Sequence, residues 1–535
     1  MKTNVNVFIA FAGVTLIAVV AQGQADLVLH EKGAFEGYTL YAPLSSTTTY
    51  LVDIEGNTVH TWENDVRTCA SVYLLDDGHL LRTVNTGQDM MGNGTFHGGG
   101  VGGGVQKLDW EGNVVWEFSH SSDKYCLHHD IEPMPNGNIL MLSWEYKTKE
   151  EAIAAGRDPD TIDDQLWPDT IIEVKPNEEG GEIVWQWHVW DHLIQDLDPR
   201  RENYGVVEEH PERIDLNFGA ETKPMGADQF QHLRSLGYLS GPAPARGGLL
   251  ANSDWNHINS IDYNPKLDQI VLSARNFSEL WIIDHSTTTQ EAAGHTGGKQ
   301  GKGGDLLYRW GNPQAYKMGD AEDQKLFVQH DVHWIEEGMP GAGDLLIFNN
   351  GEGRAEGKFS SVDQVSPPID RKGGYDRPTN KPFGPQKAEW TYTAETRSEF
   401  YSGFISGAQR LPNGNTLICS GESALFFEVT DKGEIVWEYK YTNGFEGMPG
   451  FGGGPGGRGG FGMAPFGMGG PAGAGGRGGP GRRGGPGGVG GPGGMGMMGW
   501  PGMSGGMGVF RAIRLPADFP GLADKEMEVA SKTEQ

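Results

Sequence analysis

The stretch from Leu326 to Gly338 reads LFVQHDVHWIEEG and places two histidines, His330 and His333, on either side of the carboxylate of Asp331. Three interpretations fit such a stretch. It could be a metal-binding run, a nucleophile with its helper, or a strand that happens to contain two histidines. Related segments elsewhere in the chain help to choose between these interpretations.

The segment around His330 is a loose copy of a unit that recurs along the chain. Clear copies are SVYLLDDGHLLRTV from Ser71, HDIEPMPNGNILML from His129 and GAQRLPNGNTLICS from Gly407, and a looser copy is NSIDYNPKLDQIVLSA from Asn259. Each is a strand, an Asn-Gly or Asp-Gly type turn and a returning apolar strand, which is the pattern of a β-hairpin. The repeat therefore predicts which residues occupy equivalent positions.

The repeat brings three histidines and one arginine to similar heights in different hairpins. The parallel between HHDI and QHDV makes His129 equivalent to His330. His257 lies two residues before Asn259, on the same face of a strand. The hairpin then turns near Lys266 and returns Arg275 to about the level of His257. We therefore predict a cluster of His129, His257, Arg275 and His330.

Each of these residues also has an ordinary structural interpretation. A lone histidine in a strand is usually a hydrogen-bonded structural residue, and an arginine at a strand end usually pairs with a surface carboxylate. His128 competes with His129 for the inward position. The structural interpretation is our expectation for five further histidines: His60, His79, His120, His285 and His333.

The predicted cluster suits anion chemistry better than metal binding. Three imidazoles can bind zinc, copper or iron, but an arginine beside them repels a divalent ion. Imidazolium and guanidinium groups stabilise a transferring oxyanion, and a neutral imidazole can act as a nucleophile. Two alternatives remain open: an enzyme similar to the quinoproteins, and a non-catalytic β-propeller that only binds a ligand.

A second unit alternates with the hairpins and defines the fold class. It is a turn followed by a tryptophan strand, as in VDIEGNTVHTWE from Val52, LDWEGNVVWEF from Leu108 and EVTDKGEIVWEY from Glu428. One unit of each kind gives four strands, and about six such pairs fit if VFRAIRLPADFPG near the end completes the last one. We predict an all-β fold, a six-bladed β-propeller, because a β-sandwich would not explain the regular alternation.

Composition sets further limits on function and location. Residues 1–25 contain Lys2, an apolar run and a small-residue ending, which is typical of a secretory signal peptide. The net charge of −29 argues against nucleic acid or an anionic membrane as a partner. Three widely spaced cysteines support neither a disulfide framework nor a cysteine metal site.

Two inserts interrupt a propeller predicted over residues 26–446. Residues 191–253 are expected to form helices or loops that cap one face. Residues 447–508 consist mostly of Gly, Pro, Met and Arg and cannot bury a core, so we expect disorder. We place this Gly-rich insert between strands of the last blade, with residues 509–535 as the closing segment and tail.

Several of these segments together resemble the bacterial arylsulfotransferase family. The resemblance lies in HHDIEPMPNGNILMLSWE, DWNHINSIDYNPKLDQIVLSARN, GGDLLYRWGNPQAY, QHDVHW and SGAQRLPNGNTLICSG, and extends from about Leu40 to Tyr441. That family consists of periplasmic or secreted six-bladed propellers. The resemblance implies transfer of a sulfuryl group from an aryl sulfate ester to a phenol, without a nucleotide sulfate donor.

The resemblance also implies roles for the clustered residues. His330 would attack sulfur and form a sulfohistidine, which the acceptor phenolate then discharges. His129, His257 and Arg275 would hold the sulfuryl oxygens. The substrate-binding candidates are His128, Asn259 and Asp331, and Asp331 is conjectured to orient His330.

The partners implied are small molecules: an aryl sulfate donor and a phenolic acceptor. Neither a metal nor a cofactor is expected, and no membrane attachment is expected after removal of the signal peptide. The sequence leaves the oligomeric state open.

Overall fold

The computed structural model describes residues 24–86, 95–96, 98–219, 232–236, 253–377, 379–442 and 508–527. Contacts divide the chain into two units, Met1–Gly444 with Gly505–Gln535, and Phe445–Ser504. All described elements belong to the first unit. The predicted signal peptide, apart from its last two residues, and the Gly-rich insert, apart from Gly508, lie outside the described residues.

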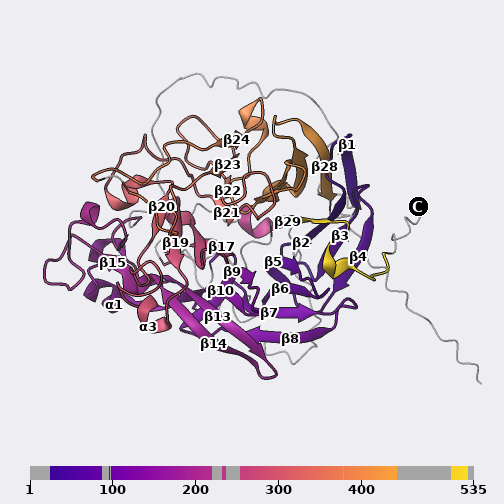
Figure 1. The fold of residues 1–535 in the computed structure, drawn as a ribbon. Helices are drawn as coiled ribbons and strands as arrows, with labels where there is room; N and C mark the ends of the chain where they lie inside the picture. Colours follow the sequence, from indigo (N-terminus) through magenta and orange to yellow (C-terminus); the bar gives the residue numbers. More distant parts are fainter. Residues whose placement is uncertain are drawn as a thin grey trace, which may run out of the picture. The chain divides into compact units, whose positions relative to one another are not determined.

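Six four-stranded antiparallel sheets make up the first unit, and the prediction of a six-bladed β-propeller is confirmed (Figure 1). The strands of the first three blades, from the inside outward, are β29 (Val509–Pro516), β2 (Gly37–Pro43), β3 (Thr48–Val52) and β4 (Thr58–Glu63); β5 (Thr68–Leu74), β6 (Leu80–Asn85), β7 (Gly103–Leu108) and β8 (Val114–Ser119); and β9 (Tyr125–Pro133), β10 (Ile139–Glu145), β13 (Asp169–Asn177) and β14 (Gly180–His188).

The strands of the remaining three blades, in the same order, are β17 (Ile258–Asn264), β18 (Gln269–Ala274), β19 (Glu279–Asp284) and β20 (Tyr308–Trp310); β21 (His330–Trp334), β22 (Leu345–Asn349), β23 (Ser361–Val365) and β24 (Trp390–Tyr392); and β25 (Gly407–Arg410), β26 (Thr416–Ser420), β27 (Leu425–Val429) and β28 (Ile435–Thr442). The sixth blade gains a fifth strand, because β1 (Gln24–His30) pairs with β28.

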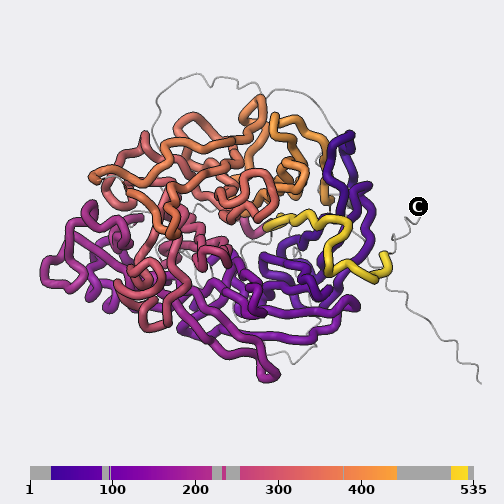
Figure 2. The backbone as a smooth tube through the Cα atoms, viewed as in Figure 1, coloured from indigo at the N-terminus to yellow at the C-terminus, as the bar shows by residue number. Residues whose placement is uncertain are grey.

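The ring closes differently from our expectation for the end segment. We expected VFRAIRLPADFPG to complete the last blade, but its strand β29 pairs with β2 and forms the innermost strand of the first blade. The closing segment thus joins the two ends of the chain, which Figure 2 shows as a yellow segment beside an indigo one. The Gly-rich insert therefore connects the sixth blade to the first and does not lie between strands of the sixth.

The predicted hairpins supply the two inner strands of the second to sixth blades, whereas β29 and β2 form those of the first. Gly78, Gly137 and Gly414 have φ values of +82°, +84° and +91° in the turns of the three clear copies, a region that glycine adopts without steric cost. The tryptophan units supply the outer strands, where Trp437 of β28 donates to the Ile54 carbonyl at 2.8 Å. That bond joins the sixth blade to the first.

The core lies between neighbouring blades. One apolar cluster joins Leu40 and Trp62 of the first blade to Leu74 and Leu108 of the second, and similar clusters join each remaining pair of neighbours. Burial of these side chains stabilises the ring, because the described blades pair with one another only through isolated backbone contacts such as the bridge between Val101 and His128. The inner strands β5, β9, β17, β21, β25 and β29 contact one another in turn and surround the central channel.

Short elements occupy the connections. They are β11 (Lys147–Thr148) with β12 (Gln165–Leu166), β15 (Leu193–Ile194) with β16 (Ile214–Asp215), the helices α1 (Lys149–Ala154) and α3 (Thr289–Ala292), and the 3-10 turns η1 (Pro159–Thr161), η2 (Val189–His192), η3 (Val207–Glu209), η4 (Arg275–Phe277), η5 (Pro313–Tyr316), η6 (Arg397–Glu399), η7 (Gly421–Ser423) and η8 (Pro520–Leu522). None of the described helices is long and apolar enough to cross a membrane.

Candidate active site

The four residues of the predicted cluster lie at one end of the inner strands. His330 is the first residue of β21, His129 lies within β9 and His257 immediately precedes β17. Arg275 is the first residue of η4 and donates its backbone N–H to the carbonyl of His257 at 3.1 Å. The hairpin geometry therefore returns Arg275 to the level of His257, as the sequence predicts.

His129 and His257 come into direct ring contact. Their ring centroids are 4.6 Å apart, with an angle of 69° between the planes. His129 is fully buried, and burial is the main reason why its pKa lies well below 6.5; the charges of His257, His128, His330 and Arg275 lower it further. The imidazole of His129 is therefore neutral near pH 7.

A carboxylate fixes the orientation of His257. Its Nδ1 lies 2.5 Å from Oδ2 of Asp254, and Asp254 lies in the connection that leads into β17. A carboxylate at Nδ1 fixes the tautomer of an imidazole. His257 is thus held ready to give or take a proton at its other nitrogen.

His330 is fully buried and is held by an amide. Its Nδ1 lies 2.8 Å from Oδ1 of Asn350, while the Asn350 amide nitrogen donates to the carbonyls of Ser402 and Ile405 at 2.8 and 2.9 Å. Since the amide nitrogen has two acceptors, the amide oxygen must accept from His330. The proton of the neutral ring therefore lies on Nδ1, and Nε2 carries the lone pair.

The lone pair of His330 faces a backbone donor. The N–H of Ile405 donates to Nε2 at 3.2 Å. Burial is the largest cause that lowers the pKa of His330 well below 6.5, and the Arg275 guanidinium is the next largest. His330 therefore keeps an unprotonated Nε2 at neutral pH, which is the form a nucleophile requires.

The backbone around the cluster adopts unusual conformations. His129, His257 and Ile405 have φ values of +49°, +50° and +48°, a region that non-glycine residues rarely occupy. Such conformations cost roughly 1–3 kcal/mol each and occur preferentially at functional sites. Gly100 also permits the close approach of His129, because a Cβ there would lie 2.3 Å from Nε2 of His129.

The remaining predicted residues lie behind or below the cluster. His128 is buried, stacks on Trp144 at 4.1 Å and pairs through Nε2 with Asp169 at 3.0 Å. It is His129 that faces His257. Asp331 accepts from the Ala408 N–H at 2.8 Å and pairs with Nε of Arg511 at 2.7 Å. Asn350 orients the ring of His330. Asp331 instead links the fifth blade to Ala408 of the sixth blade and to Arg511 of the first.

Asn259 lies within the inner strand of the fourth blade. Its amide nitrogen donates to the Gln329 carbonyl at 2.9 Å, and its Oδ1 has no hydrogen-bond partner among the described residues. The same holds for Nε of Arg275 and for both amide atoms of Asn256. Buried polar groups normally find partners, so these atoms are exceptions among the buried groups described.

The second histidine of the opening stretch behaves differently from the first. His333 lies three residues along β21, is partly exposed and approaches only Asp331 through its ring. Among the described residues, no three ligand-type side chains come together at the channel in a geometry that could hold a metal. The stretch therefore supplies one cluster histidine and one peripheral histidine.

An apolar wall covers one side of the cluster. Phe510 of β29 lies with its ring centroid 6.1 Å from His129 and 6.4 Å from His330. It packs with Phe404 and Ile405 and with two leucines of residues 232–236, Leu233 and Leu236. Residues 232–236 are the described part of the predicted capping insert near the cluster. Figure 1 shows them as a short pink helix beside β29.

Sequence reasoning missed several of these residues. Asn350 follows a buried apolar strand in the run FNNGEG, and this end-of-strand position was the available signal. Asp254 lies three residues before His257, a spacing that could also have been noticed. Phe510 gave no local signal, because it joins the cluster only when the last strand closes the first blade.

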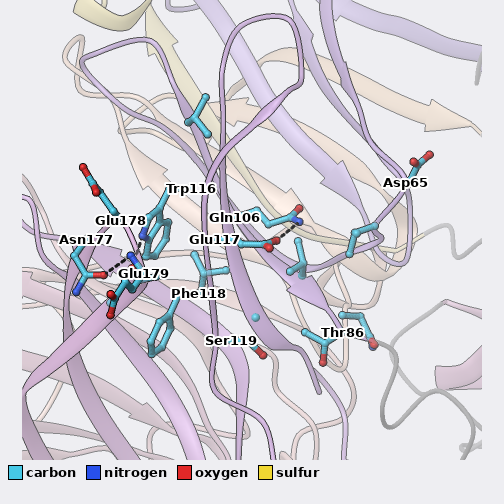
Figure 3. Close-up of a pocket in the computed structure, with 18 of the residues that line it drawn as sticks. Asp65, Thr86, Gln106, Trp116, Glu117, Phe118, Ser119, Asn177, Glu178 and Glu179 are labelled. Atoms are coloured by element: carbon cyan, nitrogen blue, oxygen red, sulfur yellow. Dashed lines mark hydrogen bonds between the residues drawn. The ribbon is translucent and has the colours of Figure 1, made fainter.

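A separate groove lies between the outer strands of the second and third blades. It measures about 990 Å³ and is lined by β7, β8 and the turn between β13 and β14. Figure 3 shows Trp116, Phe118, Gln106 and Glu117 along it, with Glu178 at its edge. None of the predicted site residues lines this groove. The histidine cluster is distinguished by its chemistry.

Together these features define a β-propeller with an anion-handling cluster at one end of its channel. Three imidazoles and a guanidinium converge there from the third, fourth and fifth blades. The family model for arylsulfotransferase (ASST) matches residues 39–445. The chain belongs to the arylsulfotransferase family.

The curated relatives carry the same family description. The chain is 26% identical over 402 residues to "Arylsulfate sulfotransferase AssT" of Lelliottia amnigena, covering 71% of this chain and 58% of that protein. It is 25% identical over 313 residues to the protein of that name from Escherichia coli O6:H1, covering 56% and 46%. The chain thus matches about half the length of these relatives.

Similarity to solved structures is low. A protein of unknown function from Bacteroides caccae gives a TM-score of 0.38 at 10% identity, covering 75% of this chain and 93% of that one.

Proposed function

We propose that the protein is an aryl sulfotransferase that moves a sulfuryl group from an aryl sulfate ester to a phenol through a sulfohistidine at His330. The observation that carries this proposal is the pair His330 and Asn350, which leaves an unprotonated nitrogen beside Arg275 and two further histidines. Membership of the arylsulfotransferase family supports it.

In the first half-reaction, Nε2 of His330 gives up the hydrogen bond from the Ile405 N–H and attacks sulfur. An N–S bond forms as the S–O bond to the aryl group breaks, and the bonding electrons leave with the phenolate oxygen. The ring becomes positively charged, and the bond from Nδ1–H to Asn350 strengthens because its donor is now cationic. In the second half-reaction, the acceptor phenolate attacks the same sulfur and His330 returns to its neutral form. Two displacements at one site give ping-pong kinetics.

The other cluster residues have distinct roles in this scheme. Arg275, with its available Nε, and Asn259 stabilise the sulfuryl oxygens, where charge is redistributed during transfer. His257, held by Asp254, exchanges the proton of the leaving or attacking phenol. His129 contacts His257 and completes the oxygen-binding side. His128 supports His129 from behind.

The apolar wall provides a binding surface for the aryl ring. Phe510 lies near both His129 and His330, so an aromatic ring packed against it would bring its sulfate ester to the cluster. Aromatic pairs prefer centroid separations of roughly 4.5–7 Å. We infer that both donor and acceptor are small aromatic molecules and that no nucleotide is required.

We further propose that the protein acts outside the cytoplasm, as a secreted or periplasmic enzyme. The apolar run and small-residue ending in residues 1–25 support this location.

The decisive experiment uses purified protein with a chromogenic aryl sulfate, in the presence and absence of excess phenol. Wild type should release phenolate faster with phenol present, and His330→Ala should release none. Mass spectrometry of wild type quenched without acceptor should find one SO₃ group on the peptide that contains His330. Absence of turnover with several aryl sulfates would contradict the proposal and favour a binding propeller. Turnover without a modified His330 would contradict the covalent route alone.

A further inference from the structure

A second polar cluster lies far from the channel, where the outer strands of the third and fourth blades meet. His192 ends η2, directly after the outer strand β14, and Asp305 precedes the outer strand β20. His295 lies in the loop between α3 and β20. Among the described residues, these three form the one group of histidine, cysteine and acidic side chains whose ligand atoms lie within 4.8 Å of one another.

The hydrogen bonds of His192 require a proton or a metal ion between its Nδ1 and the carboxylate of Asp305. Nε2 of His192 lies 2.9 Å from the Ala292 carbonyl and must donate to it, because a carbonyl can only accept. If the ring is neutral, its Nδ1 lone pair points at Oδ1 of Asp305, 2.9 Å away. Two acceptors face each other there, and either a proton or a metal ion must lie between them.

The same carboxylate oxygen faces a second imidazole. Nδ1 of His295 lies 2.8 Å from Oδ1 of Asp305. A single metal ion could bind Nδ1 of both rings and the carboxylate together, whereas without a metal ion His192 needs a second proton and His295 can donate its own Nδ1 proton to Asp305. Two histidine nitrogens and one carboxylate oxygen form a ligand set typical of zinc, with the fourth position left to water.

The surroundings of His192 resemble those of a metal ligand. A metal-binding histidine usually donates its other ring N–H to a carbonyl or carboxylate, which fixes the ring, and Ala292 provides this carbonyl. The ring also stacks on Trp187 at 5.4 Å. The side chain of His192 is fully buried, while that of His295 is 43% exposed. The cluster thus has one rigid ligand and an entry path from solvent.

The loop that carries His295 needs a polar anchor. Residues 293–304 read AGHTGGKQGKGG and contain no large apolar side chain, so burial cannot hold the loop. Backbone bonds from Gly303 to Gly297 and from Gly304 to Gly294 shape it. Polar contacts hold its middle, where Lys299 pairs with Asp268 at 2.8 Å, and the contact of His295 with Asp305 holds its beginning.

One observation opposes a metal ion. Nε of Arg213 lies 3.4 Å from Oδ1 of Asp305, and its charge repels a divalent cation. Ligating carboxylates are commonly held by a further polar partner, and Arg213 occupies that position. Its charge should weaken binding compared with a site of the same ligands that lacks it.

We propose that His192, His295 and Asp305 form a structural zinc site that joins the outer strands of the third and fourth blades. This site is independent of sulfuryl transfer. The expectation that no metal is bound concerned the channel cluster, and the sequence left open whether a structural cation is bound elsewhere.

The test measures metal on the full chain. Protein treated with chelator is titrated with Zn²⁺ by calorimetry and with Co²⁺ by absorption spectroscopy, and its Tm is recorded with and without Zn²⁺. Wild type should bind one equivalent more than His295→Ala and Asp305→Asn, and Zn²⁺ should raise the Tm of wild type but not of these two variants. The Co²⁺ complex should show the visible bands of a four-coordinate site.

A matched control is His210→Ala. The side chain of His210 is 48% exposed and pairs with Glu212 at 2.9 Å, so its loss removes a similar histidine outside the cluster. This variant should bind zinc as wild type does. Equal stoichiometry and equal Tm shifts in wild type, His295→Ala and Asp305→Asn would overturn the proposal and leave a proton-linked ion cluster.

Discussion

The amide oxygen of Asn350 lies 2.8 Å from Nδ1 of His330, and the amide nitrogen of Asn350 is committed to two backbone carbonyls. This arrangement determines which nitrogen of His330 carries the proton. It therefore determines which nitrogen can attack an electrophile.

Replacing Asn350 by Ala should slow the first half-reaction without preventing substrate binding. The lost hydrogen bond serves a ring that becomes cationic, and such bonds contribute about 1.5–3 kcal/mol. The expected decrease in the phenolate burst rate is therefore about 10- to 150-fold, as measured by stopped-flow absorbance under single-turnover conditions.

Asn349→Ala is the matched control for this variant. Asn349 is equally buried, but its side chain bonds the backbone of Phe327 and Lys325. If both variants slow the burst equally, the effect of Asn350 is general to the segment and the orienting role is wrong.

The burst rate should stay constant as pH falls from 8 to 6. Burial lowers the pKa of His330 well below 6.5, so the ring remains neutral and nucleophilic across this range. An ordinary histidine would lose activity around pH 6.5. Single-turnover kinetics isolate this step from ionisation of the acceptor phenol, and a loss of rate with a midpoint near 6.5 would contradict the burial argument.

Phe510→Ala should raise KM for aryl sulfates by about 3- to 12-fold while changing the burst rate less. The aromatic contact contributes about 0.5–1.5 kcal/mol beyond its buried area, and Phe510 is the ring nearest to both His129 and His330 among those described at the wall. Phe427→Ala, a loss of equal size in the core between the fifth and sixth blades, should leave KM unchanged. Steady-state kinetics with two aryl sulfates of different size provide the measurement.

Arg511→Met should destabilise the ring closure. Arg511 of β29 pairs with Asp130 at 2.8 Å and with Asp331 at 2.7 Å, and both carboxylates are buried. Removing one partner from a buried ion pair costs about 3–5 kcal/mol, which should appear as a lower urea midpoint.

The control for this variant is Arg200→Met. Arg200 pairs with Asp198 but its side chain is 82% exposed, and surface pairs of this kind contribute little. Equal midpoints for the two variants would show that Arg511 does not hold the ring closed.

The sequence by itself determined the blade repeat and the equivalence of its positions. Hairpin turns and tryptophan strands are local patterns, and they fix the number of blades and the matching places of His129 and His330. The same register aligned Arg275 with His257. These predictions needed no partner from a distant part of the chain.

Only the tertiary structure decided what surrounds these residues. Ile405 and Phe510 lie far along the chain from His330, and the closing strand β29 belongs to the first blade because β2 offers a free inner edge for pairing. Likewise, a doublet such as HH does not reveal which ring faces inward, because a positive φ at His129 disrupts the alternation of a regular strand. Local periodicity specifies the strands, whereas closure of the ring brings separate blades together at one site.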